Sequence, residues 1–279
     1  MKIDQETVAF ITGGAAGIGF ALAMALGKRG AKIMLADLNQ LQLDKAVQAL
    51  TAQNIEAAAV LCDVADEKQM RAAANATIAR FGKVHIVANN AGVALGGTPG
   101  EIAMKDWRWI VDINLIGVAH GVEIFTPLIQ SHGEGGHFIN TASMAGHGAT
   151  AGMAPYHATK FAVVGYSEGL KPELEPSNIG VSVLCPAWVK TNIHRSALDK
   201  PTGGNSEDDP QFKAMETVIG SGLNPADVAE WTVECVEDNR FYIFTHPEFA
   251  GGIDMRHAQI KADYDACAQF PAFQKANAS

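Results

Sequence analysis

The stretch Val8-Ala-Phe-Ile-Thr-Gly-Gly-Ala-Ala-Gly-Ile-Gly19 decides the fold of this chain. Its first residues form a continuous apolar run, which is typical of a strand buried on both faces. Three glycines follow, and a helix-forming segment from Phe20 to Arg29 comes next. Glycines let the backbone approach a ligand closely, and the amino end of a helix attracts anions. The order strand, turn, helix therefore predicts a pyrophosphate site; a tight turn without a ligand is the alternative.

The same alternation of strands and helices continues along the chain. Each predicted strand is a short apolar run without polar alternation, which indicates a parallel sheet with helices on both faces. We therefore expect a single-domain α/β protein over residues 1–279, with a Rossmann fold and a doubly wound parallel sheet of about seven strands. The predicted strands are 8–12, 32–36, 57–61, 84–88, 137–141, 181–185 and 241–244, and the predicted helices are 20–29, 41–52, 67–81, 107–129, 156–174 and 225–238.

The bulk composition argues against several partner classes. The chain has 279 residues and a formal net charge of -9, so we expect neither nucleic acid nor an anionic membrane as partner. We expect no membrane-spanning segment, because by its sequence no apolar run is long enough to cross a bilayer. The N-terminus lacks an apolar signal region, which favours the cytoplasm. The four cysteines are far apart, which indicates neither a disulfide framework nor a metal site.

Polar residues follow the ends of the predicted strands. In a parallel sheet covered by helices, ligands bind beyond the carboxyl ends of the strands. We therefore expect these residues to converge on one rim of the sheet and to form the functional site. They are Thr12, Asp37, Asp63, Asn89, Ser143 and Pro186.

Asp37 ends the second predicted strand, 18 residues after Gly19. A carboxylate at this place can accept hydrogen bonds from both ribose hydroxyls of an adenosine, and it repels a 2′-phosphate. The glycine turn carries Ala15 and Ala16 where a cation could offset that repulsion. The sequence therefore favours NAD over NADP as cofactor. The alternative role for this carboxylate is a helix N-cap.

Two further strand ends carry side chains with two possible roles each. Asp63, followed by Val64, can hydrogen-bond the adenine amino group or cap the end of its strand. The run Asn89-Asn90-Ala91-Gly92 places two amides beside a glycine. The Asn90 amide can brace the neighbouring loop or contact the ribose, and the sequence leaves both roles open.

A hydroxyl, a phenol and an ammonium lie between Ser143 and Lys160. Tyr156 and Lys160 are four residues apart, so both project from one face of a predicted helix. A free tyrosine has a pKa of about 10, and a nearby cation favours its phenolate. Ser143 can hydrogen-bond the phenol or a substrate oxygen. The three side chains form a candidate general acid/base; the alternative is a surface Tyr and Lys on an ordinary helix.

A series of motifs runs in order through residues 5 to 195. The motifs are Thr12-Gly13-x-x-x-Gly17-x-Gly19, Asp37, Asp63-Val64, Asn89-Asn90-Ala91-Gly92, Trp107 seven residues before Asn114, Ser143, Tyr156-x-x-x-Lys160 and Pro186-x-x-Val189-x-Thr191. This series resembles the short-chain dehydrogenase/reductase family. The resemblance implies a catalytic tetrad of Asn114, Ser143, Tyr156 and Lys160.

The resemblance also implies how a cofactor is held. Lys160 would hold the nicotinamide ribose, and Val189 and Thr191 would contact the carboxamide. Together with the residues at the strand ends, the expected cofactor contacts are Gly13, Gly17, Ile18, Gly19, Asp37, Asp63, Val64, Asn90, Ala91, Gly92, Tyr156, Lys160, Pro186, Val189 and Thr191.

The reaction implied by the resemblance is hydride transfer between a secondary alcohol and its ketone. Tyr156 would exchange the proton as general acid/base, and Lys160 would lower the pKa of the phenol. Ser143 would hold the substrate oxygen, and Asn114 would position a water that links Lys160 to solvent. From the residues alone, Asn114 is a helix hydrogen-bonding residue, so its role rests on the resemblance.

The expected pocket wall is apolar or aromatic, without an obvious Lys or Arg. This composition favours a neutral hydrophobic substrate, aromatic or alicyclic, over a carboxylate or phosphate. Core packing is the alternative for each residue, and we assign His147 no catalytic role. The residues are Met144, Ala145, His147, Met153, Ala154 and Trp188.

Two segments lie outside the motifs. Residues 192–224 are polar and rich in Pro and Gly, which indicates a mobile insertion that is either a substrate lid or a solvated surface loop. Residues 245–279 form an expected C-terminal extension. The predicted helices 107–129 and 156–174 resemble the pair that builds the usual dimer interface of the family, so we expect a homodimer or a homotetramer.

Three other functions compete with an NAD-dependent alcohol dehydrogenase. A carrier-linked ketone reductase commonly uses NADPH and a basic docking patch, and Asp37 and the acidic charge argue against both. A steroid-type ketone reductase would share the site and differ in substrate. A non-catalytic NAD-binding protein would not need the complete set of Ser143, Tyr156 and Lys160.

Overall fold

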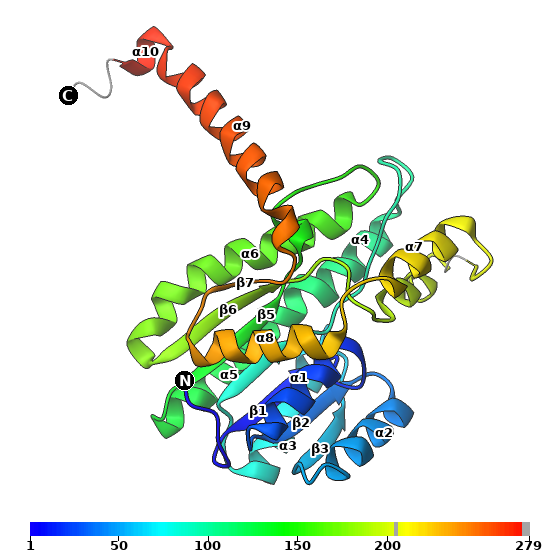
Figure 1. Ribbon diagram of the computed structural model, residues 1–279, viewed down its shortest axis with the longest axis vertical. Helices are drawn as coiled ribbons and strands as arrows, with labels where there is room; N and C mark the ends of the chain where they lie inside the picture. The colour runs from blue at the N-terminus through cyan, green and yellow to red at the C-terminus, as the bar shows by residue number, and fades with distance from the viewer. Residues whose placement is uncertain (204–205, 275–279) are drawn as a thin grey trace. The chain divides into compact units, whose positions relative to one another are not determined.

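The computed structural model describes residues 1–203 and 206–274. The chain divides into two compact units, Met1–Thr245 and His246–Ser279. The first unit contains a seven-stranded parallel sheet with the order β3-β2-β1-β4-β5-β6-β7 (Figure 1). The strands are β1 (Val8–Thr12), β2 (Lys32–Asp37), β3 (Ala57–Leu61), β4 (Ile86–Asn89), β5 (Gly136–Thr141), β6 (Ile179–Cys185) and β7 (Tyr242–Phe244).

Helices connect successive strands and lie on both faces of this sheet (Figure 1). The described part of the second unit contains the short helix η5 and the helices α9 and α10. The α-helices are α1 (Gly17–Lys28), α2 (Gln40–Thr51), α3 (Glu67–Phe81), α4 (Met104–Val111), α5 (Gly117–His132), α6 (Ala154–Leu174), α7 (Pro210–Gly220), α8 (Pro225–Glu237), α9 (Ala250–Ala268) and α10 (Pro271–Gln274). The 3-10 helices are η2 (Met144–Gly146), η3 (Glu175–Ser177), η4 (Ile193–Leu198) and η5 (Pro247–Phe249).

The central strands bury side chains on both of their faces. Ala9 and Ile11 of β1 belong to one hydrophobic core, which they share with residues of α1, α2 and α8. Phe10, between them in sequence, belongs to a second core with residues of α3, α5 and α6. Successive strand residues point to opposite faces, so a strand covered on both sides has to be apolar throughout. The predicted doubly wound α/β fold is confirmed.

The parallel register brings the carboxyl ends of the strands to one rim. Thr12 of β1 lies opposite Ala36 of β2. Asn89, the last residue of β4, lies opposite Asn140 near the end of β5. The polar residues that follow the strands therefore share one rim of the sheet.

The predicted helix over residues 107–129 is longer and contains a change of helical type. The helical segment runs from Met104 to His132, and a π-helical turn, η1 (Asp112–Ile116), separates α4 from α5. Such a turn widens the helix locally and is frequent at functional sites. It holds Asn114, which the family resemblance marks as catalytic.

The segment Met104–His132 is also long and apolar enough to cross a membrane, contrary to the expectation that no apolar run of this chain has that length. This is weak evidence for a span, because the core helix of a soluble protein passes the same test. In the apolar window of this segment, 44% of the residues are buried inside the protein. Val122, Phe125 and Ile129 of α5 belong to the second hydrophobic core described above.

Residues 192–224 contain regular structure, although the sequence suggested a mobile loop. The 3-10 helix η4 and the helix α7 both lie within this segment. Residues 204–205 of the expected lid, and 275–279 of the expected C-terminal extension, lie outside the described residues.

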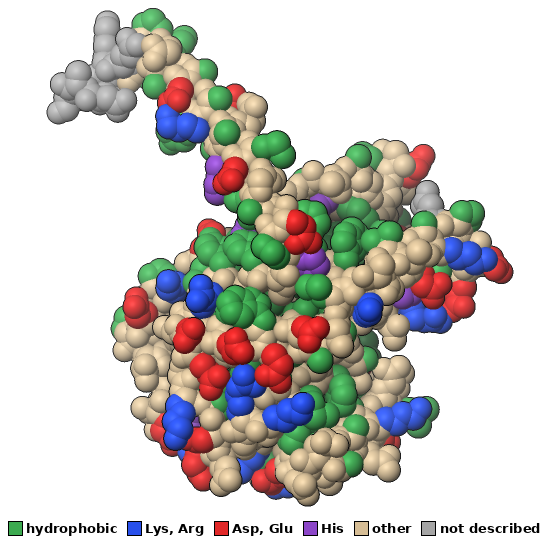
Figure 2. Space-filling model, viewed as in Figure 1, with side chains coloured by type: hydrophobic (Ala, Val, Ile, Leu, Met, Phe, Trp, Pro, Cys, Tyr) green, Lys and Arg blue, Asp and Glu red, His purple; other side chains and the backbone are tan. Residues whose placement is uncertain are grey.

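Helix α8 carries an acidic outer face. Asp227 and Glu234 are exposed on this helix, and Figure 2 shows acidic side chains gathered where it lies. Arg29, directly after α1, forms ion pairs with Glu230 at 2.8 Å and with Glu237 at 3.2 Å. These pairs join α1 to α8, beneath which the apolar side chains of both helices share the first core.

A buried chain of polar side chains crosses from the sheet into α6. The Asn89 amide donates a hydrogen bond to the side-chain oxygen of Asn140 at 2.9 Å, and the Asn140 amide donates to the Ser167 hydroxyl at 3.0 Å. The side-chain oxygen of Asn89 has no hydrogen-bond partner among the described residues. It faces Gly121 of α5, where a Cβ atom would lie only 1.8 Å away.

Replacing Gly121 with Ala should lower the free energy of unfolding by about 3 kcal/mol, because the methyl group overlaps with the Asn89 amide and displaces the buried polar chain. Urea denaturation measures this loss. Gly82→Ala is the matched control, since its Cβ atom would meet nothing within 4 Å but its φ of 82° is left-handed. We expect this control to lose only about 1 kcal/mol. Equal losses in the two variants would contradict the proposed overlap.

Candidate active site

The glycine turn after β1 forms a cradle at the amino end of α1. Gly17 has a φ of 54°, in the left-handed region that favours glycine. At Gly19 a Cβ atom would lie 2.2 Å from the carbonyl oxygen of Gly13, so no larger residue fits. Within the described residues, no side chain caps the first turn of this helix, because Ala16 stands at the N-cap position. The backbone N–H groups of that turn can therefore bind an anion.

Thr12 and Asn90 fasten this cradle to the neighbouring strand end. The Thr12 hydroxyl accepts hydrogen bonds from the N–H groups of Asn90 at 2.9 Å and Ala91 at 3.1 Å. The Asn90 side-chain amide donates to the carbonyl oxygens of Thr12 at 3.2 Å and Gly13 at 3.3 Å. Of the two roles left open for Asn90, bracing is the contact that the protein makes.

Asp37 and Asp63 stand at the ends of β2 and β3, where their carboxylates bind backbone groups. Asp37 accepts hydrogen bonds from the N–H of Ala15 at 3.1 Å and of Asn39 at 3.2 Å. The N-cap of α2 is Asn39, so the alternative role of Asp37 as helix N-cap is wrong. Asp63 accepts from the N–H of Ala65 at 2.9 Å. Asp37 thus joins the glycine cradle to the end of β2.

Ser143 and Tyr156 come from two elements at the rim. Ser143 follows β5 and is the N-cap of η2, where its hydroxyl accepts from the N–H of Ala145 at 3.1 Å. The same hydroxyl donates to the carbonyl oxygen of Pro186 at 3.1 Å. Tyr156 lies in the first turn of α6. Burial raises the pKa of the Tyr156 phenol, and a hydrogen bond with Ser143 partly opposes this effect.

Lys160 lies one turn further along α6 and is only 3% exposed. Its ammonium donates to the carbonyl oxygen of Thr141 at 2.9 Å and lies 5.6 Å from the centroid of the Tyr156 ring. Burial lowers the pKa of Lys160 to about 8, and the interaction with Cys185 partly opposes the decrease. The cationic form therefore still predominates at pH 7, close to the phenol.

Asn114 reaches the site through the π turn η1 and is completely buried. Its side chain accepts from the N–H of Val93 at 2.8 Å and donates to the carbonyl oxygen of the same residue at 2.9 Å. It also donates to the Thr159 hydroxyl at 3.2 Å. A Cβ atom on Gly92 would lie 3.3 Å from Asn114 Oδ1 and 3.6 Å from Lys160 Nζ. These two side chains thus meet at the same short piece of backbone.

The other residues expected to contact the cofactor lie along the same rim or directly beneath it. The methyl group of Thr191 lies beside Gly17, 3.1 Å from the place of a Cβ atom there. Val189 is buried and forms an isolated β-bridge with Leu223. The remaining apolar side chains of this group pack against the two cores: Ile18, Val64 and Ala91.

The residues expected in the pocket wall have different surroundings. Trp188 is 44% exposed, whereas Met144 packs against a third small core between α6 and β6. Met153 lies beside Gly96, so the loop after β4 runs next to the start of α6. The ring of His147 contacts the Cys185 sulfur at 3.3 Å. This histidine is therefore engaged with the end of β6, a contact that the sequence did not predict.

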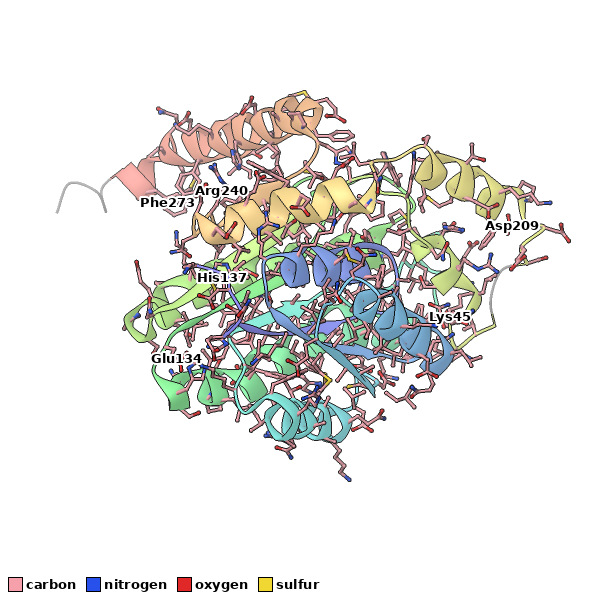
Figure 3. All side chains as sticks on the ribbon, turned by 60° about the horizontal axis from the view of Figure 1, so that its bottom comes forward. Lys45, Glu134, His137, Asp209, Arg240 and Phe273 are labelled. Atoms are coloured by element: carbon pink, nitrogen blue, oxygen red, sulfur yellow. The ribbon has the colours of Figure 1, made fainter. Side chains whose placement is uncertain are left out.

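A second cluster of ionisable groups lies at the amino ends of β4 and β5, where Figure 3 labels Glu134. His85, His132 and Glu134 hold potential metal-binding atoms within 4.8 Å of one another. His85 Nδ1 accepts from the N–H of Val8, which leaves the proton on Nε2, 3.1 Å from the Glu134 carboxylate. His132 Nε2 donates to the carbonyl oxygen of Val84 at 2.9 Å. These bonds occupy the ring nitrogens, so the cluster fastens a loop and is a poor metal site.

A polar cavity of about 450 Å³ opens at this same amino edge. Its lining includes Asp4, Glu6 and His137, and Figure 3 labels His137. Burial lowers the pKa of His137 to about 3, so its ring is neutral at physiological pH. The described lining of this cavity holds no phenol beside a buried cation and no turn before a helix. The carboxyl rim is therefore the candidate active site.

A family model described as short chain dehydrogenase matches residues 7–202. The chain belongs to the short chain dehydrogenase family. C alpha-dehydrogenase of Sphingobium sp. (strain NBRC 103272 / SYK-6) is 36% identical over 268 residues, which cover 94% of this chain and 88% of that protein. A short chain dehydrogenase/reductase from Burkholderia phymatum, solved in complex with NAD, is 37% identical with a TM-score of 0.89 over 94% of this chain and 96% of that chain.

Membership of the short chain dehydrogenase family makes this chain an oxidoreductase for small alcohols or ketones with a nicotinamide cofactor. The family uses both forms of the cofactor. A variant actinorhodin polyketide ketoreductase, solved with NADPH, is 28% identical with a TM-score of 0.74 and covers 86% of this chain and 95% of that chain. The choice between NAD and NADP therefore depends on the residues at the rim.

Replacing Lys160 with Met should stabilise the cofactor-free protein at pH 7 by roughly 1–3 kcal/mol, because the parent buries an ammonium whose pKa falls to about 8. Between pH 8 and pH 10.5 the folded protein loses the Lys160 proton, whereas the unfolded chain keeps it, because the ordinary pKa of a lysine is 10.5. The parent therefore gains stability as the pH rises through this window, and the advantage of the variant should vanish near its upper end. Urea denaturation at pH 7 and at pH 10.5 measures the difference in the free energy of unfolding between variant and parent. A variant no more stable than the parent at pH 7 would refute a free-energy cost of burying the Lys160 ammonium.

Proposed function

We propose that this chain is an NAD-dependent oxidoreductase that interconverts a neutral hydrophobic secondary alcohol, aromatic or alicyclic, and its ketone. The observation that carries the proposal is the buried ammonium of Lys160, 5.6 Å from the ring of Tyr156. A phenol beside a buried cation can accept and return a proton near neutral pH. Family membership supports this chemistry at this rim.

The residues of the rim fit a dinucleotide. The glycine cradle and the uncapped amino end of α1 suit a pyrophosphate. The carboxylate of Asp37, held beside the cradle by the N–H of Ala15, suits the two ribose hydroxyls. When bound, the nicotinamide supplies the hydride acceptor for oxidation and the hydride donor for reduction. Val189 and Thr191 are proposed to hold its carboxamide end.

The choice of NAD rests on charge at the end of β2. Asp37 brings a carboxylate to the place where the two cofactors differ, and a 2′-phosphate there would meet a like charge. The nearest residues of the glycine turn are Ala15 and Ala16, which offer no cation. The chain from Burkholderia phymatum, which is 37% identical to this one, was solved with NAD, which agrees with this choice.

Tyr156 is proposed to accept the alcohol proton on its phenolate oxygen during oxidation and to return it during reduction. Burial alone raises the pKa of this phenol, which disfavours the phenolate. The cation of Lys160 acts in the opposite direction, since it stabilises a negative charge on the neighbouring ring oxygen. Lys160 has to stay protonated for this effect, and its pKa of about 8 keeps it so at pH 7.

Ser143 and Asn114 are proposed to hold the reacting groups in place. In the protein alone, the Ser143 hydroxyl donates to the carbonyl oxygen of Pro186. To donate to a substrate oxygen, the hydroxyl has to leave that acceptor, so substrate binding exchanges one hydrogen bond for another. Asn114 fixes the backbone of Val93 and thereby the segment next to Lys160. We propose that this arrangement keeps a water path to the lysine.

The wall around Ser143 suits a neutral hydrophobic substrate. Ala145 lies two residues after Ser143, Met153 directly precedes α6, and Trp188 is partly exposed two residues after Pro186. These residues carry no charge, which disfavours a carboxylate or phosphate in the substrate. Met153 can adapt to different shapes because its side chain is unbranched and flexible.

Two further properties are part of the proposal. The cysteines Cys62, Cys185, Cys235 and Cys267 are free thiols, which agrees with a reducing cytoplasm. We propose assembly as a homodimer or homotetramer through the pair α5 and α6. A steroid-type reductase remains an alternative within the same chemistry, while a non-catalytic NAD-binding protein would leave the buried Lys160 unexplained.

Replacing Tyr156 with Phe should lower kcat by about 10²–10⁴-fold, because the proton donor and acceptor is lost. Absorbance of NADH with a panel of hydrophobic secondary alcohols measures turnover, and calorimetry should find that NAD binding is retained. Tyr166→Phe, on the same helix, is the matched control, since its hydroxyl only donates to Glu123 at 3.3 Å. Turnover that survives in Tyr156→Phe on every accepted alcohol would refute the assignment.

Replacing Asp37 with Asn should shift the ratio of kcat/KM for NADP over NAD upward by at least about tenfold, because one negative charge next to the 2′ position disappears. The amide keeps an oxygen that can accept the N–H of Ala15, so the glycine turn stays in place. Asp63→Asn, at the neighbouring strand end, should leave the ratio nearly unchanged. A parent enzyme that already prefers NADP, or a ratio that does not move, would overturn the choice of NAD.

A further inference from the structure

Residues 192–202, here called the strap, follow Thr191 and contain η4. The first anchor of the strap is Ser196, whose hydroxyl accepts a hydrogen bond from the N–H of Ala94 at 2.9 Å. Ala94 comes two residues after Gly92, which lies between the side chains of Asn114 and Lys160. The strap is therefore tied directly to the backbone that approaches the catalytic ammonium.

The second anchor joins the far end of the strap to α4. The backbone N–H of Thr202 donates to one carboxylate oxygen of Asp106 at 3.0 Å, and the Thr202 hydroxyl donates to the other at 2.6 Å. The two residues are 96 positions apart in the chain. Both donors of one strap residue are thus matched to both oxygens of one carboxylate.

Asp106 is unusual because it is a buried carboxylate, with only 4% of its surface exposed. It lies in the first turn of α4, where the helix dipole favours a negative charge. The neighbouring Lys105 directs its ammonium to the carbonyl oxygen of Pro201 at 2.7 Å. A buried charge is retained at a site only where its hydrogen bonds compensate the loss of water. Here those bonds go to the strap.

We propose that Asp106 is a positioning residue that holds the strap closed beside the substrate through Thr202. The proposal rests on the proposed function, because it assigns the strap to the wall of that site. With Ser196 bound inside η4 and Thr202 bound at the end of the strap, the residues between them are held between the loop after β4 and the first turn of α4. Release of Thr202 would free one end of this wall and weaken substrate binding, while the proton-transfer groups on α6 would stay in place.

Two substitutions test the anchor from its two sides. Asp106→Leu keeps a similar side-chain shape but removes both acceptor oxygens, and Thr202→Val removes the hydroxyl donor alone. We expect each to raise KM for the alcohol by about tenfold, with kcat changed less than about threefold. The reason is that the strap loses a hydrogen bond to a charged group, opens more often and binds the substrate less tightly. Thr202→Ser, which keeps both donors, should retain the KM of the parent. Lys105→Met, which removes the exposed bond to Pro201, should change KM by less than about twofold.

Limited trypsin digestion gives a readout that does not depend on turnover. Arg195 lies in the strap and offers a cleavage site next to Ser196, whereas Lys200 precedes a proline and is resistant. Cleavage after Arg195 in folded protein should be about tenfold faster in Asp106→Leu and Thr202→Val than in the parent, because the open strap is more populated. The rate in Thr202→Ser should equal that of the parent.

A raised KM together with faster cleavage supports the proposal. Faster cleavage with an unchanged KM would overturn it, since the strap would then be anchored without shaping the substrate site. Unchanged cleavage in both variants would overturn it as well. If the parent oxidises no alcohol and reduces no ketone, the proposed function fails, and the cleavage rates alone then decide whether Asp106 holds the strap.

Discussion

The sheet is covered by helices on both faces, and this constraint decides where the polar groups of the protein lie. A strand such as β1 contributes Phe10 to one core and Ile11 to the other, so no polar side chain can be placed along its middle at low free energy. Polar and charged side chains are therefore concentrated at the strand ends. The parallel register brings the carboxyl ends to one rim, and the groups proposed to bind the cofactor and to react meet there.

The rim is held together largely by hydrogen bonds between side chains and backbone. Thr12 accepts from two N–H groups of the loop after β4, and Ser143 donates to the carbonyl oxygen of Pro186. Lys160 donates to Thr141, and Asn114 binds both backbone groups of Val93. Each of these bonds joins segments that are not neighbours in the chain, so the bonds can form only because the sheet places the strand ends side by side.

The buried ammonium of Lys160 shows how chemistry and stability oppose one another at this rim. Burial lowers its pKa to about 8, which means that the folded protein holds the cation at a free-energy cost. A single hydrogen bond to Thr141 compensates part of that cost. In the proposed mechanism the cation is needed at this place because it lies near a phenol whose pKa burial raises. An apolar side chain would be more stable here and unable to assist a proton transfer.

The sequence by itself determined the elements whose signals are local. The strands at 8–12 and 57–61 and the helix at 67–81 have the predicted ends, because apolar runs and helix periodicity are properties of neighbouring residues. The spacing of Tyr156 and Lys160 likewise placed both on one helix face. Only the tertiary structure decided the π turn at Asn114, the pairing of that residue with Val93, and the bond between Asp106 and Thr202. These features depend on contacts between segments that are distant in the chain, and no local pattern of residues encodes such contacts.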